Sequence, residues 1–211
     1  EKNEDHGTFI DLYRTQDGLV KHKLLSKYDN KPILEHPIDP KRKDKDGVIQ
    51  VWEFPPPNRQ TYGVYWAGID IVASSVSNTS PSLNSIHIYK GSHNLSDEYT
   101  EDRIVAKFMS RTSDKMDFYK KAMLLLEWYN AEALVENNVT WFIEEAIKAK
   151  EQFRLARNPQ WARDMTPQGI SHVNRPFGVL SGTKLIDKMI EAISSYIKEP
   201  TYVTYDENTG E

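Results

Sequence analysis

Three short stretches in the first half of the chain have the pattern of strands, one by its apolar, β-rich composition and two by alternation of hydrophobic and polar residues. Residues 65–72 are apolar and rich in β-formers, and the alternation returns in residues 85–89 and 103–109. A period of two is typical of a strand that buries one of its faces. We therefore expect three consecutive strands, joined by loops into an antiparallel meander.

The period of the apolar positions changes to that of a helix after residue 114. The positions that repeat at helical spacing are Phe118, Ala122, Leu125, Leu126 and Tyr129. Ser113 or Asp114 is placed to cap the N-terminus of this helix. A second helix is predicted over residues 141–150, and a third, amphipathic helix over residues 185–197.

Two shorter apolar runs complete the expected fold. Residues 131–135 end at Asn137-Asn138 and predict a fourth strand, and residues 153–156 predict a fifth. The resulting order is β-β-β-α-β-α-β-α, with antiparallel strands first and crossovers later. It predicts an α/β fold in which a mixed five-stranded sheet is flanked by helices.

The N-terminal part of the chain is more polar than the rest. Residues 8–13 are β-like, but a charged stretch interrupted by prolines follows them as far as residue 46. We expect residues 1–47 to form a linker or a peripheral segment. Residues 48–54 alternate again until three prolines stop them, so the main domain is expected over residues 48–211.

Composition narrows the possible functions. The 211 residues include 38% hydrophobic residues, enough for one domain with a sizeable core. The sequence contains no apolar run long enough for a membrane span and no secretion signal, so an intracellular protein without membrane contact is expected. The absence of cysteine excludes a thiolate metal site, so any metal must be held by oxygen or imidazole. With a net charge of -4, the chain lacks the excess of basic residues that is typical of nucleic-acid-binding domains.

Two acids are the candidates for chemistry. Asp70 interrupts the apolar stretch Gly68-Ile69-Asp70-Ile71-Val72, where a buried carboxylate would need a partner or a metal. Glu136 follows the run Ala133-Leu134-Val135 at the carboxyl end of a predicted strand, a place where ligand sites gather in open α/β sheets. The ordinary alternatives are a strand-end acid in solvent for Asp70 and a helix-start acid for Glu136.

The two acids become more informative as a pair. If the first and fourth strands of the expected sheet are neighbours, Asp70 and Glu136 face each other, and their repulsion requires a cation between them. Oxygen ligands of this kind select Mg²⁺ or Mn²⁺. Asp70 and Glu136 are therefore predicted to be metal ligands.

Sequence motifs around these acids extend this interpretation. Tyr65-Trp66-Ala67-Gly68-Ile69-Asp70 is followed by Ser85-Ile86-His87-Ile88-Tyr89 and later by Tyr129-Asn130-Ala131-Glu132-Ala133-Leu134-Val135-Glu136-Asn137-Asn138. In their order and spacing these motifs resemble the nuclease domain of the large terminase subunits of tailed phages. The resemblance extends from about residue 48 to about residue 199.

The resemblance implies a ribonuclease H-like fold and a two-metal endonuclease. It implies that Asp70 binds both ions and that Glu136, after the fourth strand, binds one. The family takes a third acid from a later segment, for which this chain offers no convincing match. Asp206 and Glu207 are the first acids well clear of the last predicted helix, and a position beyond Glu211 is left open.

The resemblance also implies partners. The expected substrate is concatemeric double-stranded DNA in the host cytoplasm, cut with little sequence preference during viral genome packaging, and the expected protein partners are the portal and the small terminase subunit. Basic residues in the second half of the chain are candidates to line a DNA groove, with scattered surface charge as the equal alternative: Lys148, Lys150, Arg154, Arg157, Arg163 and Arg175.

Two further functions stay open at this point. One is a non-catalytic module that has kept the fold and docks on DNA or on the portal. The other is a different ribonuclease H-like enzyme, such as a junction resolvase or an integrase. Bound Mn²⁺ between Asp70 and Glu136 separates the nuclease from the docking module, and a preference for branched DNA favours the resolvase.

Overall fold

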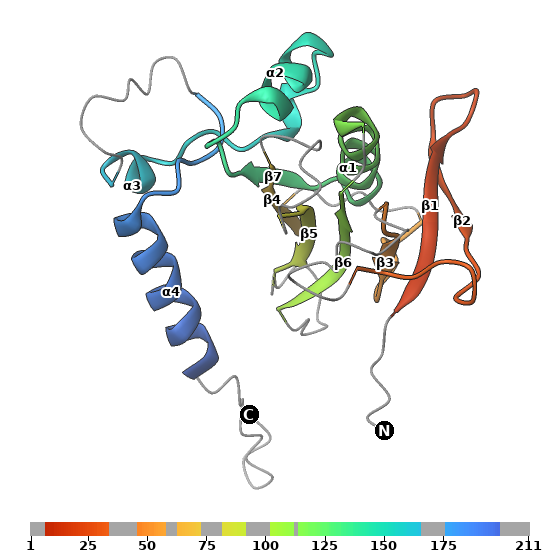
Figure 1. Cartoon of the computed structure of the whole chain (residues 1–211), viewed down its shortest axis with the longest axis horizontal. Helices are drawn as coiled ribbons and strands as arrows, with labels where there is room; N and C mark the ends of the chain where they lie inside the picture. The colour runs from red at the N-terminus through yellow and green to blue at the C-terminus, as the bar shows by residue number, and fades with distance from the viewer. Residues whose placement is uncertain are drawn as a thin grey trace, which may run out of the picture.

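The computed structural model describes residues 7–33, 46–57, 63–72, 82–91, 102–111, 114–165 and 176–198. These residues form an α/β fold in which helices flank one mixed sheet of seven strands, ordered β2-β1-β3-β6-β5-β4-β7 (Figure 1). The strands are β1 (Thr8–Arg14), β2 (Val20–Leu24), β3 (Ile49–Val51), β4 (Tyr65–Asp70), β5 (Asn84–Lys90), β6 (Arg103–Ser110) and β7 (Glu132–Val135). The helices are α1 (Lys115–Tyr129), α2 (Trp141–Lys148), the 3-10 helix η1 (Gln152–Arg154), α3 (Gln160–Arg163) and α4 (Thr183–Lys198).

The centre of the sheet follows the predicted order of elements. β4, β5 and β6 are antiparallel neighbours, and β7 returns after α1 to pair in parallel with β4. Because β4 and β7 run in the same direction, their carboxyl ends meet at the same edge of the sheet. The expected meander and the expected neighbourhood of the first and fourth predicted strands are both confirmed.

Helix α1 covers one face of this sheet. The five residues predicted at helical spacing are all buried, and Phe118 stacks on Phe108 of β6 at a ring-centroid distance of 5.6 Å. Asp114 is the cap, since its carboxylate accepts a hydrogen bond from the Met116 N–H at 2.9 Å. At the other end, Asn130 ends the helix in the left-handed conformation, with φ of 50°.

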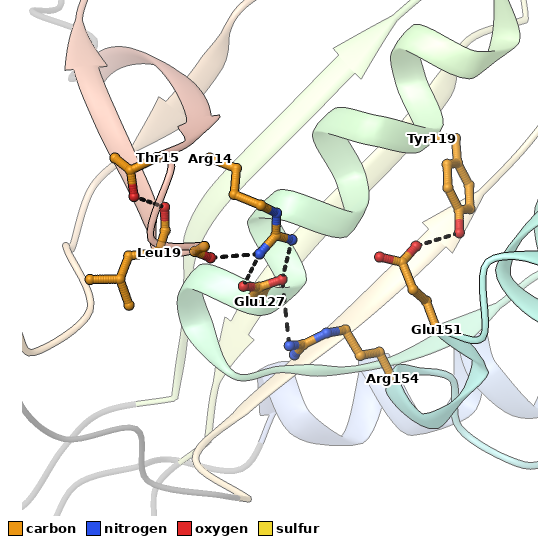
Figure 2. A network of polar contacts seen from close by, with 8 residues as sticks. Arg14, Thr15, Leu19, Tyr119, Glu127, Glu151 and Arg154 are labelled. Atoms are coloured by element: carbon orange, nitrogen blue, oxygen red, sulfur yellow. Dashed lines mark hydrogen bonds and ion pairs between the residues drawn. The ribbon is translucent and has the colours of Figure 1, made fainter.

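The strand count differs from the sequence-based prediction of five. Within residues 1–47, expected to be a linker or a peripheral segment, β1 and β2 form a hairpin at one edge of the same sheet, and Ile10 and Leu12 join the main core. The hairpin is also tied to α1, because Arg14 donates two hydrogen bonds to the carboxylate of Glu127, at 2.7 and 2.6 Å (Figure 2). Arg154 approaches the same carboxylate at 3.7 Å from the other side.

The predicted strand at residues 153–156 is wrong. The chain there forms η1, and only Leu155 makes an isolated parallel bridge, to Ala133 of β7. Phe153, the first residue of the predicted strand, is 70% exposed. Glu151 fixes the start of this turn by accepting a hydrogen bond from the Tyr119 hydroxyl at 2.7 Å (Figure 2).

The last helix is the amphipathic one predicted from the sequence. In Figure 1, α4 extends away from the sheet, and Leu185 in its first turn is buried against Leu134 and Ala162. Its apolar residues beyond that turn are exposed: Ile186, Met189, Ile190 and Ile193. Among the described helices, none has the length and apolar character that crossing a membrane requires.

Candidate metal centre

Asp70 and Glu136 lie side by side at one edge of the sheet. Asp70 is the last residue of β4, and Glu136 directly follows β7. The parallel register pairs Ile69 with Val135, and the Glu136 N–H continues it by donating to the Ile69 carbonyl at 2.8 Å. The structure therefore brings together the two acids that the sequence singled out.

The side chain of Asp70 lies on the sheet face that α1 does not cover. Along β4, Tyr65, Ala67 and Ile69 are buried, while the residues between them and Asp70 itself are exposed. Asp70 is thus not enclosed by its apolar neighbours in the sequence, although its carboxyl group is partly buried. The apolar neighbours of Asp70 face the opposite side, as the two-residue period of a strand requires.

The environment of Asp70 nonetheless disfavours its charged form. Partial burial of the carboxyl group, together with the hydrogen bond and the negative charge of Glu136, raises the pKa of Asp70 to about 7. Two carboxylates this close cannot both be ionised without a counter-charge. Near neutral pH the pair must therefore hold a proton or a cation.

Several contacts fix the strand end that carries Asp70. The Ile71 N–H donates to the Asp70 carboxylate. One residue further, the Val72 N–H donates to the side-chain oxygen of buried Asn84 at 3.0 Å, and the Val72 carbonyl accepts from the Trp141 indole at 3.1 Å. Each of these backbone groups has a partner, so the position of Asp70 is set by the frame of β4, β5 and α2.

Glu136 is positioned by a second group of contacts. The Asn138 side-chain amide donates to Glu136 Oε1 at 2.7 Å, and Asn138 Oδ1 accepts from the Ser181 N–H at 3.1 Å. Glu136 also forms a parallel bridge with Val179. Gly178 makes this approach possible, since it has φ of 70° and an added Cβ would lie 2.4 Å from the Val135 carbonyl oxygen.

Sequence reasoning did not give Asn138 a role. There Asn137-Asn138 marks the end of a strand and of a family-like motif, but an amide two residues after a strand-end acid is also a usable signal for an orienting hydrogen bond. The contribution of residues 178–181 carries no comparable signal. Their place beside Glu136 depends on the path of a chain segment that is remote in sequence.

The pair fits a hard divalent cation. Carboxylate oxygens are the ligands that Mg²⁺ and Mn²⁺ prefer, and one cation between Asp70 and Glu136 would remove the repulsion that raises the pKa of Asp70. Among the described residues, no group of three or more histidines or acids forms a metal site. Asp206 and Glu207, the acids considered for a third ligand, lie outside the described residues.

The basic residues expected to line a DNA groove are partly engaged within the chain. Lys148 pairs with Glu145 at 2.7 Å, Arg154 approaches Glu127, and the Arg163 Nε–H donates to the Asn158 carbonyl at 2.9 Å. Arg175 lies outside the described residues. These contacts favour a structural role for Arg154 and Arg163, the more enclosed of the three residues.

Comparison with known proteins adds no second source of information about this site. Neither a model of a known protein family nor a curated protein sequence matches the chain. The arrangement of Asp70 and Glu136 therefore carries the functional interpretation by itself.

Proposed function

We propose that this protein is a metal-dependent endodeoxyribonuclease with a ribonuclease H-like fold. The observation that carries the proposal is the pair of Asp70 and Glu136 at the carboxyl ends of adjacent parallel strands, with the pKa of Asp70 raised by burial and by Glu136. The order of β6, β5, β4 and β7, a meander followed by a helix and a parallel strand, supports the same fold class.

In the proposed hydrolysis, two residues would bind the metal ions and two other groups orient the metal-binding carboxylates. Asp70 and Glu136 would hold Mg²⁺ or Mn²⁺, with two ions expected from the resemblance to terminases. When bound, such ions supply positive charge beside the phosphate and a water acidic enough to lose its proton near neutral pH. Asn138 orients the carboxylate of Glu136, and the Ile71 N–H orients that of Asp70.

The substrate and partners of the proposed enzyme follow from the same resemblance. The substrate is concatemeric double-stranded DNA, cut during viral genome packaging in the host cytoplasm. The protein partners are the viral portal and the small terminase subunit. Little sequence preference is expected, because ligands that act on the phosphate do not read base edges.

A non-catalytic docking module is the second candidate function. The observation that favours it is the set of only two acids in the described part of the site. A module of this kind would bind DNA or the portal and cleave nothing. A junction resolvase, the third possibility, would cut branched DNA in preference to linear DNA.

Cleavage of a plasmid by this chain, with Mn²⁺, Mg²⁺ or EDTA, tests the proposal. We expect cutting with Mn²⁺ or Mg²⁺, none in EDTA, and a loss of at least about 100-fold in Asp70→Asn and Glu136→Gln, as for removal of groups that stabilise transition-state charge. Asp117→Asn is the matched control, since Asp117 is exposed on α1, behind the other face of the sheet.

The possible results separate the candidates. Cleavage that persists in both acid variants would refute the assignment of this site. If the parent chain binds Mn²⁺ but cuts nothing, even when extended past Glu211, the docking module becomes the better interpretation. A preference for four-way junctions over linear duplex would favour the resolvase.

A further inference from the structure

Gly68 is a glycine that the fold itself does not require. It occupies the middle of β4, its φ lies outside the left-handed region, and no atom of the described residues lies within 4 Å of where its Cβ would be. Gly7, Gly47 and Gly178 differ, because each has a positive φ and a Cβ there would lie within 2.8 Å of a backbone oxygen.

A glycine in a central strand has a cost. It loses more backbone freedom on folding than other residues and offers no side chain to pack. In a strand interior such a glycine often marks a place where a ligand or another backbone approaches closely. No heavy atom of the described residues lies within 4 Å of the Cβ position of Gly68, so within this part of the chain the close approach of a ligand fits the position better than that of another backbone.

The neighbours of Gly68 connect this bare position to the acid pair. Asp70 is the next residue on the same face of β4, and Trp66, 42% exposed, is the previous one. His87 of β5 and Leu134 of β7 lie on either side of Gly68 in the register. Trp66, Gly68 and Asp70 thus form a strip along the exposed face of β4, with Gly68 as its lowest point.

The charges along this strip indicate what kind of ligand it accepts. Glu132, beside Trp66, and the two acids of the pair are negative, while Lys107, beside His87, is positive and lies 5.9 Å above the ring of Trp52. With more acids than bases, the strip accepts a phosphodiester only after a cation has occupied the pair. Trp66 offers an exposed ring on which a sugar or a base can pack.

We propose that Gly68 is where the backbone of the substrate DNA strand passes closest to the sheet on its way to Asp70 and Glu136. This inference rests on the proposed nuclease function. Side chains on a strand stand roughly perpendicular to the sheet, so any residue larger than glycine would hold the strand away from the carboxylates.

Gly68→Val tests the inference, with Gly68→Ala as the smaller step. Valine favours a strand, and its Cβ would have no described atom within 4 Å at this position, so the melting temperature is expected to stay equal or to rise. Affinity for a fluorescent DNA duplex in Ca²⁺, measured by anisotropy, is expected to fall about tenfold or more. Cleavage with Mn²⁺ is expected to fall in parallel, with a smaller loss in Gly68→Ala.

Binding of Mn²⁺ itself keeps this test separate from that of the proposed function. Gly68→Val retains both carboxylates, so its Mn²⁺ affinity, measured by calorimetry, is expected to equal that of the parent chain. Tyr13→Val is the control for placing valine on an exposed strand position, since Tyr13 lies on β1, remote from β4 in the sheet order. It is expected to leave DNA affinity unchanged.

Three results would overturn the inference. If Gly68→Val binds and cuts DNA as the parent does, the inference is wrong while the nuclease proposal stands. A clear fall in melting temperature would show that the glycine serves the fold. If the parent has no DNA affinity in Ca²⁺, no strand passes over Gly68, and its Mn²⁺ binding then decides separately whether the acid pair is a metal site.

Discussion

Two acids of this protein, Glu53 and Asp70, have opposite surroundings and opposite shifts in pKa. Burial tends to raise the pKa of Glu53, but hydrogen bonds from Lys90 and Arg103 hold it below its usual value. In contrast, burial and a second carboxylate raise the pKa of Asp70 to about 7. Within the described part of the chain, no lysine or arginine forms an ion pair with Asp70.

This difference separates acids that support the fold from acids that require something else. Glu53, in the segment after β3, forms ion pairs with Lys90 of β5 and Arg103 of β6, so its charge stabilises the frame of the sheet. The Tyr129 hydroxyl also donates to the Glu53 carbonyl at 2.5 Å. The chain thus supplies cations where a carboxylate has a structural task. Among the described residues, no lysine or arginine forms an ion pair with Asp70 or Glu136, so a cation from solution can serve as the counter-charge there.

A lysine placed beside the acid pair should produce the largest effect of the three changes, a loss of Mn²⁺ affinity. Ser85 lies directly across from Asp70 in the register of β4 and β5, so a lysine there reaches its carboxylate. For Ser85→Lys we expect Mn²⁺ affinity to fall by about 100-fold, because the lysine replaces the metal as counter-charge. Calorimetry with Ser85→Met as the uncharged control measures this, and unchanged Mn²⁺ affinity in Ser85→Lys would contradict it.

Removing the charge of an acid that already has basic partners should lower the stability of the fold and leave Mn²⁺ binding unchanged. Glu53→Gln leaves Lys90, whose side chain is only 14% exposed, without its ion pair. We expect the free energy of unfolding to fall by about 2 kcal/mol, in the range for loss of a charged hydrogen bond. Urea denaturation measures the change, and Mn²⁺ affinity should stay the same. A loss of Mn²⁺ binding with normal stability would mean that the two groups of acids are not distinct.

The smallest effect expected is the pH dependence of the metal-free protein. The raised pKa of Asp70 means that, between pH 4 and about 7, the folded state retains a proton that the unfolded chain has released. Stability therefore falls as pH rises through this range and then levels off. Because Asp70 is exposed, we expect only about 1 kcal/mol after screening by solvent.

The measurement compares the parent with Asp70→Asn between pH 5 and 8, in EDTA. Asparagine cannot ionise, so the variant should lose this part of the pH dependence and be the more stable protein at pH 8. Mn²⁺ binding to the parent should also release a proton below pH 7. Identical pH profiles in the two proteins would mean that neither burial nor Glu136 raises the pKa of Asp70 in the folded protein.

The acid pair could be predicted because it follows from the strand and helix periods of the sequence and from a single pairing, that of β4 with β7. The periodicity gives a meander, a helix and a strand, and two acids at strand ends meet once β4 and β7 are neighbours. The hairpin was harder to predict as part of the sheet. In β2 the sequence VKHKL is mostly exposed: only Val20 is partly buried against the core, and the exposed His22 contacts Trp128 with a ring-centroid distance of 5.2 Å.

The misread segments have a common physical reason. Residues 153–156 are apolar enough for a strand, yet Glu151 and Arg154 anchor a turn through contacts with α1, a remote part of the chain. The support of Glu136 by Ser181 and Val179 is equally remote in sequence. Contacts of this kind depend on the packed structure and leave no period or motif.

The parallel pairing of β4 with β7 also determines when the site can appear during folding. β5, β6 and α1 lie between the two strands in the chain, so the pairing of β4 with β7 closes a long loop at a cost in chain entropy. Long-range pairings of this type are among the slow steps of folding. Asp70 and Glu136 therefore meet late, and a chain still being synthesised has no acid pair before residue 136 emerges, so a cation that needs both carboxylates can bind only after β4 and β7 have paired.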